Sequence, residues 1–242
     1  MSTTDSKVVG VLGGMGPGAT IDFMATVLAL TPTRSEQGHV HMIVDNDPGI
    51  PSRQDAILRG SPSPGPALAA MARRLQAAGA DFLVMPCNTA HAFGGPIREA
   101  VSIPFISIID VTVAACNTYQ SVGLLATEGC LRSGVYQAAL GTAGKEILLP
   151  ADEELAKFMQ LTFRVKQGDA AAEVASEMLQ LAEALMQRGA EALIAGCTEI
   201  PLVLKAGMLG IPLISSTEEL AKTTIALAQD RKAPDTPENQ SA

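Results

Sequence analysis

An internal repeat constrains the fold of this chain more than any other sequence feature. Residues 79–87 read GADFLVMPC and residues 189–197 read GAEALIAGC, an offset of 110 positions. Downstream, IPFIS at 103–107 matches IPLIS at 211–215 at an offset of 108. Two copies are too few for a solenoid. The repeat therefore predicts two similar lobes related by a pseudo-twofold axis.

Hydrophobic patterning indicates the content of each lobe. Short β-branched apolar runs alternate with Ala- and Leu-rich segments of helical period, which is typical of an α/β protein with parallel strands. Predicted strands cover 8–12, 40–45, 82–85, 105–108, 122–126, 146–149, 192–195 and 213–214. The spacing predicts helices over 68–78 and 170–188, and the Pro-rich segment 60–66 is predicted as a surface loop. We expect a mostly parallel sheet flanked by helices in each lobe, and an active site in the cleft between the lobes.

These elements predict a division of the chain into lobes. The N-terminal α/β lobe is predicted to contain residues 1–113 together with 214–242, with a C-terminal helix returning to it. The second α/β lobe is predicted over 114–213. The polar tail from about residue 230 is predicted to be disordered.

Composition excludes several functional classes. The chain has 242 residues, a net charge of −8 and no Lys/Arg-rich stretch, so it lacks the basic surface of a nucleic-acid binder. Aromatic residues make up 3% and Trp is absent, which leaves few rings for base stacking. No run approaches the roughly 20 apolar residues of a membrane helix. The N-terminal segment has no basic region like that of a signal peptide. We therefore expect no nucleic-acid or membrane partner, a cytoplasmic location and reduced thiols.

The four cysteines form no C-x-x-C pair, and the three histidines have no metal-binding spacing, so no metal site is predicted. Cys116 and Cys130 have no counterparts in the repeat and are interpreted as core residues. Cys87 and Cys197 end equivalent strands of the two copies. Ligands of parallel sheets bind at the carboxyl ends of strands. Two facing lobes would thus present these two thiols to one ligand from opposite sides.

Such a pair suits inversion of a stereocentre. One thiolate removes a proton, and the other thiol returns a proton to the opposite face. Only a few per cent of an ordinary thiol is ionised at neutral pH, and a following helix N-terminus would favour the thiolate. Repulsion between two thiolates favours one thiol and one thiolate. His91, one turn beyond Cys87, could polarise that thiol or cap the helix start.

Three other features leave alternatives open. The Gly-rich segment 13–20 follows a strand and could offer backbone N–H groups to an anion, or it is a tight turn packed on the sheet. It lacks the P-loop Lys and the Rossmann glycine spacing. Arg53 follows Asp45-Asn46-Asp47-Pro48 and could bind a carboxylate with its guanidinium fork, or it is a solvated surface residue. Lys166 likewise could bind a carboxylate, or it is a solvated surface residue.

Motifs distributed over residues 8–228 resemble those of the cofactor-independent aspartate/glutamate racemase superfamily, and within it those of the aspartate racemases. The matching segments are GGMGP at 13–17, NDP at 46–48 with Arg53, PCNTAH at 86–91, LLAT at 124–127, SGVY at 133–136 and AGCTE at 195–199.

This resemblance implies two α/β lobes, commonly in a homodimer, and a small amino acid or dicarboxylate as substrate. Cys87 and Cys197 would be the acid/base residues, and no pyridoxal phosphate or other cofactor would be needed. Arg53 and Lys166 would match the basic residues that bind substrate carboxylates. The remaining predicted substrate-binding residues are Met15, Asn88, Thr89, Ala90, Thr127, Thr198 and Glu199.

Departures from the family pattern bear on the substrate. Gly14-Met15 and Glu199 replace the Asp-Ser and His that are usual in cell-wall glutamate racemases. Thr162 replaces a tyrosine of some aspartate racemases, and Ser215 replaces a common aspartate. We therefore predict racemisation of L- and D-aspartate, with a broad-specificity racemase of glutamate or neutral amino acids as an alternative. A maleate isomerase or arylmalonate decarboxylase-like enzyme, and a non-catalytic binding module, are further alternatives.

Overall fold

The computed structural model describes residues 6–169, 171–205 and 207–229. These residues form two four-stranded parallel sheets, with strand orders β2-β1-β3-β4 and β6-β5-β7-β8. The strands are β1 (Val9–Gly13), β2 (Met42–Asn46), β3 (Phe82–Val84), β4 (Phe105–Ile106), β5 (Ser121–Leu125), β6 (Glu146–Leu148), β7 (Ala192–Ala195) and β8 (Leu213–Ser215). All eight predicted strands are therefore confirmed, with ends shifted by one or two residues.

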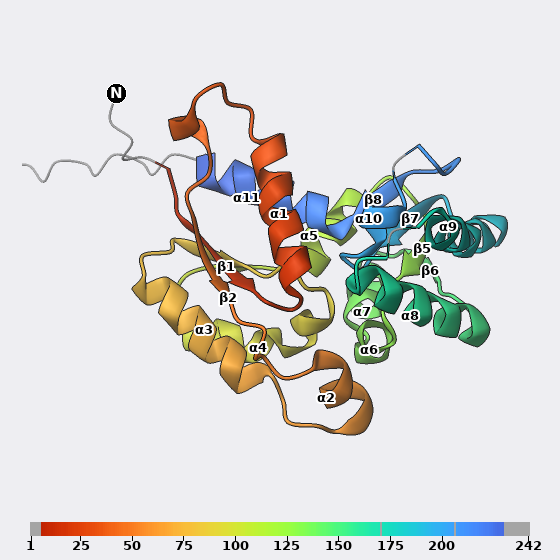
Figure 1. Cartoon of the computed structure of the whole chain (residues 1–242), viewed down its shortest axis with the longest axis horizontal. Helices are drawn as coiled ribbons and strands as arrows, with labels where there is room; N and C mark the ends of the chain where they lie inside the picture. The colour runs from red at the N-terminus through yellow and green to blue at the C-terminus, as the bar shows by residue number, and fades with distance from the viewer. Residues whose placement is uncertain (1–5, 170, 206, 230–242) are drawn as a thin grey trace, which may run out of the picture.

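The two sheets have the same topology, as the repeat predicted. Val9 of β1 pairs with Phe82 of β3, and Val122 of β5 pairs with Ala192 of β7 in the corresponding place. Figure 1 shows the first sheet with α1 and α3 on one side of the molecule and the second sheet with α8 and α9 on the other. The α/β class with two lobes is confirmed.

Helices cover the faces of both sheets. They are α1 (Pro17–Leu30), α2 (Arg53–Arg59), α3 (Gly65–Ala77), α4 (Gly94–Ala100), α5 (Ile108–Ala115), α6 (Glu128–Ser133), α7 (Val135–Thr142), α8 (Asp152–Lys166), α9 (Ala172–Gln187), α10 (Ile200–Val203) and α11 (Ser216–Gln229), with 3₁₀ turns η1 (Glu36–Gly38) and η2 (Thr89–Phe93). None of the helices in the described residues is long and apolar enough to cross a membrane.

Two boundaries differ from the sequence prediction. The loop predicted over 60–66 ends early because α3 begins at Gly65, with Pro66 in its first turn. Proline is favourable there because the first helical N–H groups have no partner inside the helix. The strand predicted over 105–108 ends at Ile106 because Ser107 caps α5 by accepting a hydrogen bond from the amide of Asp110.

The hydrophobic core has a shared central part and two outer parts. Strand residues of both sheets, including Val11 and Leu124, pack in one cluster with α1, α5, α7 and α11. Separate clusters lie beneath α3 and α4 in the first lobe and beneath α8 and α9 in the second. The shared cluster joins the lobes and so places the ends of β3 and β7 in a defined mutual position.

The C-terminal helix α11 packs against α1 and α5, after β8 has completed the second sheet (Figure 1). The division of the chain into lobes at 113 and 213 remains a prediction. The predicted disordered tail from about residue 230 lies outside the described residues.

The loop after β1 depends on a glycine. Gly14 has φ +91°, and a Cβ added there would lie 2.3 Å from the backbone of Asp47. Gly14→Ala is therefore expected to lower the free energy of unfolding by about 3 kcal/mol, from backbone strain and overpacking together. Urea unfolding measures this loss.

Gly18→Ala is the matched control, since Gly18 lies in α1 with open space around its Cα. Alanine there is expected to raise the free energy of unfolding by about 0.5 kcal/mol. Equal stabilities of the two variants would contradict this explanation of the loop.

Candidate active site

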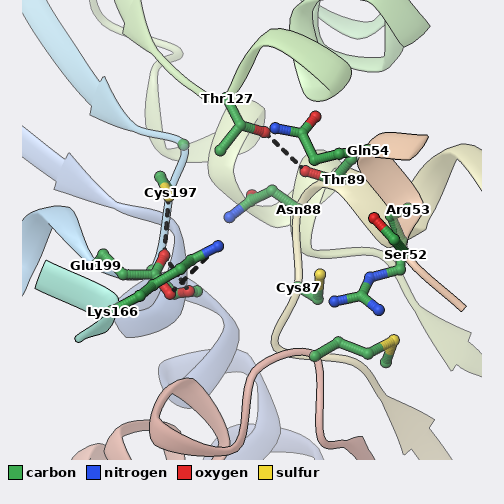
Figure 2. A pocket seen from close by; sticks show the side chains of 13 residues that line it. Ser52, Arg53, Gln54, Cys87, Asn88, Thr89, Thr127, Lys166, Cys197 and Glu199 are labelled. Carbon is green, nitrogen blue, oxygen red and sulfur yellow. Dashed lines mark hydrogen bonds and ion pairs between the residues drawn. The ribbon is translucent and has the colours of Figure 1, made fainter. Parts of the chain in front are cut away.

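A cavity of about 150 Å³ lies between the lobes, where the loops after β1, β3, β5 and β7 meet. Its walls come from both sheets, and Figure 2 shows their side chains converging on one space. The lining residues are Met15, Ser52, Arg53, Gln54, Cys87, Asn88, Thr89, Thr127, Lys166, Gly196, Cys197, Thr198 and Glu199.

The cavity brings together ten of the eleven residues predicted from the sequence. The exception is Ala90, which was predicted to bind substrate. Its side chain is fully buried in the outer core of the first lobe and does not line the cavity. The reason is geometric: Ala90 lies in η2, and that turn directs Thr89 toward the cavity and the Ala90 methyl toward the core.

The repeat predicted that Cys87 ends a strand. In the structure β3 ends at Val84, and Cys87 lies between that strand end and the 3₁₀ turn η2, which begins at Thr89. The backbone around it is held by His91, whose Nδ1 lies 2.9 Å from the carbonyl oxygen of Cys87. The amide of Ile108 donates to Nε2 of the same ring at 3.1 Å. Burial lowers the pKa of His91 to about 4, so the ring is neutral near pH 7. His91 therefore bridges Cys87 to the start of α5 and does not itself line the cavity.

Cys197 follows β7 and reaches the cavity from the second lobe (Figure 2). Its thiol donates a hydrogen bond to Oε2 of Glu199 at 2.9 Å. Burial, and after it the charge of the Glu199 carboxylate, hold the pKa of Cys197 well above its usual range. Cys87 and Cys197 are only 9% and 5% exposed, and both line this cavity.

Asn88 is held by a chain of hydrogen bonds that crosses between the lobes. Tyr136 donates to its Oδ1 at 2.8 Å, and its Nδ2 donates to the hydroxyl of Ser216 at 3.0 Å. Ser216 in turn donates to the carbonyl of Ala195 at the end of β7. The Asn88 side chain therefore has a fixed orientation beside Cys87.

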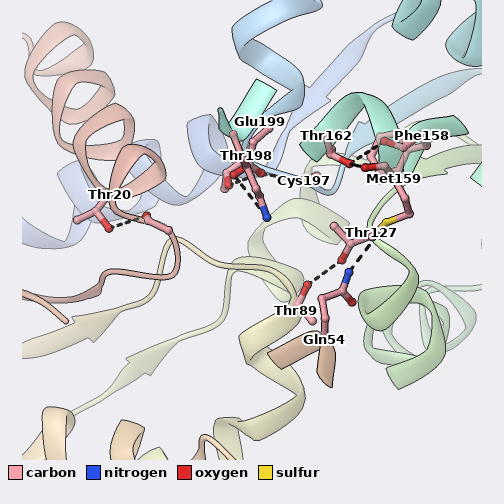
Figure 3. A network of polar contacts seen from close by, with 12 residues as sticks. Thr20, Gln54, Thr89, Thr127, Phe158, Met159, Thr162, Cys197, Thr198 and Glu199 are labelled. Carbon is pink, nitrogen blue, oxygen red and sulfur yellow. Dashed lines mark hydrogen bonds and ion pairs between the residues drawn. The ribbon is translucent and has the colours of Figure 1, made fainter. Parts of the chain in front are cut away.

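A second set of contacts joins the lobes on another side of the cavity (Figure 3). The hydroxyl oxygens of Thr89 and Thr127 lie 2.9 Å apart. Gln54 of α2 accepts a hydrogen bond from the amide of Gly129 in α6 at 2.5 Å. These contacts leave hydroxyl and amide groups at the cavity surface, where they can bind polar groups of a ligand.

Two cationic side chains reach the cavity. Arg53 begins α2, and its Nη1 donates to the carbonyls of Ile50 and Pro51 at 3.1 and 3.0 Å. Among the described residues, Nε and Nη2 of Arg53 have no hydrogen-bond partner. This edge of the guanidinium group is therefore available for a carboxylate. Lys166 ends α8, with Nζ 3.9 Å from Oε1 of Glu199.

The other two cysteines lie in the core. Cys116 and Cys130 are fully buried in the shared core, as predicted, and burial raises their pKa values to about 11 and about 12. Thr162 and Ser215, which depart from the family pattern, do not line the cavity. Thr162 donates to the carbonyl of Phe158 within its own helix, and Ser215 caps α11 through the amide of Glu218.

The Gly-rich segment forms a tight turn, which was one of its two predicted roles. The amide of Gly14 donates to the hydroxyl of Thr20 and is not available to an anion. Within the described residues, no three His, Cys, Asp or Glu side chains gather closely enough to hold a metal ion.

Sequence reasoning missed several residues of the site. Ser52, Gln54 and Gly196 line the cavity, and their positions next to Arg53 and Cys197 were the available signal. Tyr136 lay in a motif quoted above, but its role in orienting Asn88 depends on a contact across 48 positions. Periodicity carries no information on such a contact.

The arrangement combines two thiols, a guanidinium fork and neutral hydroxyl and amide groups around a small polar cavity. Two thiols that reach one cavity from different lobes can act as base and acid on opposite faces of one carbon. A pair of thiols in a cleft between two α/β lobes is an arrangement suited to an enzyme that inverts a stereocentre.

The family described as Asp/Glu/hydantoin racemase matches residues 12–224, and the chain belongs to this family. The broad specificity amino-acid racemase RacX of Bacillus subtilis is 29% identical over 229 residues, which are 90% of this chain and 97% of that protein. The glutamate racemase of Corynebacterium glutamicum is 31% identical over 158 residues, which are 62% of this chain and 56% of that protein. The structure of Picrophilus torridus aspartate racemase superposes with a TM-score of 0.82 at 29% identity, covering 93% of this chain and 95% of that one.

Proposed function

We propose that this protein racemises a small α-amino acid by proton transfer between Cys87 and Cys197. The observation that carries the proposal is the meeting, in one cavity, of two thiols from repeat-equivalent positions. One thiolate removes the Cα proton while the other thiol donates a proton to the opposite face, and the roles exchange in the reverse direction. In this proposal Asn88, Thr89, Thr127 and Thr198 would hold the α-carboxylate and amine, and all four line the cavity.

Aspartate is the substrate that we propose first. Arg53 and Lys166 both line the cavity, so a dicarboxylate has two cations available to it. The similarity to an aspartate racemase over nearly the whole chain supports this assignment. Because the net charge of the chain is −8, binding of an anion depends on these two local cations.

A broad-specificity racemase is the second candidate. Its specific support is the carboxylate of Glu199, which lies 3.9 Å from Lys166 and partly neutralises that cation. A site with one effective cation fits an amino acid with one carboxylate. The similarity to a broad-specificity racemase agrees with this alternative.

A substrate panel tests the proposal and separates the two candidates. The purified protein is incubated with the L and D forms of aspartate, glutamate and alanine, and the products are resolved by chiral chromatography. For an aspartate racemase we expect kcat/KM for aspartate to be at least about tenfold above that for alanine, since about 1.4 kcal/mol from the second carboxylate gives that factor. Similar values for all three would support broad specificity. Inversion of none of them, with the fold intact, would contradict a racemase of these amino acids.

The homodimer and the cytoplasmic location remain predictions. Helix α1 supports the homodimer, because its only charged residue is Asp22 and it leaves Ile21 and Leu28 66% and 57% exposed. Helices that are apolar on all sides are usually buried. Light scattering on the purified chain measures its mass, and a monomer across micromolar concentrations would contradict the prediction.

A further inference from the structure

The pseudo-twofold symmetry of the site is broken beside the two cysteines. The repeat aligns Cys87-Asn88-Thr89 with Cys197-Thr198-Glu199, so a threonine in one lobe corresponds to a carboxylate in the other. A reaction that interconverts mirror images does not itself require different surroundings for its two thiols. The difference between Thr89 and Glu199 therefore needs a separate explanation.

The Glu199 carboxylate is buried and is held against Cys197 (Figure 2). Its Oε2 accepts hydrogen bonds from the thiol of Cys197 at 2.9 Å and from the hydroxyl of Thr198 at 3.2 Å. Its Oε1 lies 3.9 Å from Nζ of Lys166. The ammonium group of Lys166 therefore lies beside the oxygen of Glu199 that does not contact Cys197. An ionised carboxylate can only accept hydrogen bonds, so the proton between Cys197 and Glu199 belongs to the Cys197 sulfur.

The other charged and titratable groups around Cys197 come from several elements. Lys166 of α8 faces it from its own lobe, and Arg53 and Cys87 line the opposite part of the cavity. Asp22 of α1 interacts electrostatically with both Glu199 and Lys205, and it does not line the cavity. Glu199 is the one carboxylate that lines the cavity within the described residues.

The surroundings of Cys87 differ in this respect. Its Sγ has no hydrogen-bond partner in the part of the chain that the structure describes, and its backbone is held by the neutral His91. The position that corresponds to Glu199 is occupied by Thr89, whose hydroxyl contacts Thr127. No negative charge therefore adjoins the Cys87 sulfur from its own loop.

We propose that Glu199 is a positioning residue that keeps the shared proton of the cysteine pair on Cys197, so that Cys87 is the thiolate of the resting enzyme. This inference rests on the proposed two-thiol racemisation. For the enantiomer whose Cα–H faces Cys87, the Cα–H bond breaks and the proton joins the Cys87 sulfur. The S–H bond of Cys197 then breaks, and its proton forms the new Cα–H bond on the opposite face.

The enzyme then holds a Cys87 thiol and a Cys197 thiolate. It returns to rest when Cys197 takes up a proton from water and Cys87 releases one. Glu199 remains a carboxylate throughout, and it favours this return because it repels the Cys197 thiolate. Two enantiomers have an equilibrium constant of unity, so kcat/KM is equal in both directions whatever the resting state. Titration of the thiols therefore tests the inference, and catalytic rates do not.

The experiment follows alkylation of each cysteine by iodoacetamide as a function of pH, with the modified sites quantified by mass spectrometry. In the wild-type protein we expect the midpoint of Cys87 modification to lie below that of Cys197. In a Cys87→Ser background, Glu199→Gln is expected to lower the Cys197 midpoint by about one pH unit or more, because a like charge is removed. Lys166→Met is expected to raise the same midpoint, because an opposite charge is removed.

Controls keep the experiment decisive. Glu99→Gln removes an exposed carboxylate of α4 and is expected to leave both midpoints unchanged. Glu199→Asp keeps the negative charge but moves it away from the Cys197 sulfur, so its Cys197 midpoint is expected to lie between those of the wild type and Glu199→Gln. This variant provides the test if Glu199→Gln does not fold. Modification of Cys197 before Cys87 in the wild type, or a Cys197 midpoint that Glu199→Gln does not lower, would overturn the inference. Because no substrate is used, either result is independent of whether the protein racemises aspartate.

Discussion

Cys87→Ser and Cys197→Ser are each expected to lower kcat for racemisation by about 10³-fold or more. A positioned acid or base contributes about 10²- to 10⁴-fold to such a reaction, and a serine hydroxyl does not ionise in the pH range where a thiol does. Each variant removes one of the two thiols that the cavity brings together and that we propose as the proton-transfer groups. Chiral chromatography of aspartate incubated with each variant measures the loss.

Cys116→Ser is the matched control. This thiol is fully buried in the shared core and donates to the carbonyl of Thr112 at 3.3 Å, a contact that a serine hydroxyl can keep. We expect its kcat to stay within about threefold of the wild-type value, since Cys116 does not line the cavity. A serine variant of Cys87 or Cys197 with near wild-type activity would show that the proton transfer uses another group.

Arg53→Met is expected to raise KM for the substrate by about 10²-fold. The Nε and Nη2 groups of Arg53 form the available edge of its fork, since Nη1 already donates to the carbonyls of Ile50 and Pro51. Loss of charge-assisted hydrogen bonds to a carboxylate costs about 3 kcal/mol, which corresponds to that factor. Steady-state kinetics with aspartate measures the change.

The same helix offers a control for Arg53→Met. Arg59 lies at the other end of α2, where it pairs with Asp55 on the surface and its side chain is 77% exposed. Arg59→Met is expected to leave KM unchanged, because exposed ion pairs contribute little and Arg59 does not line the cavity. If Arg53→Met and Arg59→Met had the same KM, Arg53 would not bind the substrate carboxylate.

Much of the fold could be predicted from the sequence because the core is aliphatic and strongly patterned. Every strand was found, and the repeat predicted two sheets of the same order. The predicted boundaries of strands and loops differed from those of the structure where the start of a helix decides them. Ser107 caps α5 inside a segment that hydrophobicity assigned to a strand, and α3 begins at Gly65 inside a segment whose Pro content assigned it to a loop.

The site could be predicted where residues lie at the ends of repeated strands, as Cys87 and Cys197 do. Contacts between the lobes could not be predicted in the same way. The hydrogen bond from Tyr136 to Asn88 and the contact between Thr89 and Thr127 depend on how the two sheets pack. The carboxylate of Glu199 was predicted to contact substrate, and its hydrogen bond with Cys197 emerged only from the structure.

Racemisation of L-aspartate in D₂O, followed at low conversion, tests the two-thiol mechanism most directly. Thiols exchange with solvent, so the cysteine that acts as the acid carries deuterium before the substrate binds. If one cysteine removes the Cα proton and the other supplies the new one, the first D-aspartate formed carries deuterium at Cα. The L-aspartate recovered at the same time keeps its proton. Mass spectrometry of the separated enantiomers should show this pattern, whereas D-aspartate that retains the original proton would contradict transfer between two thiols.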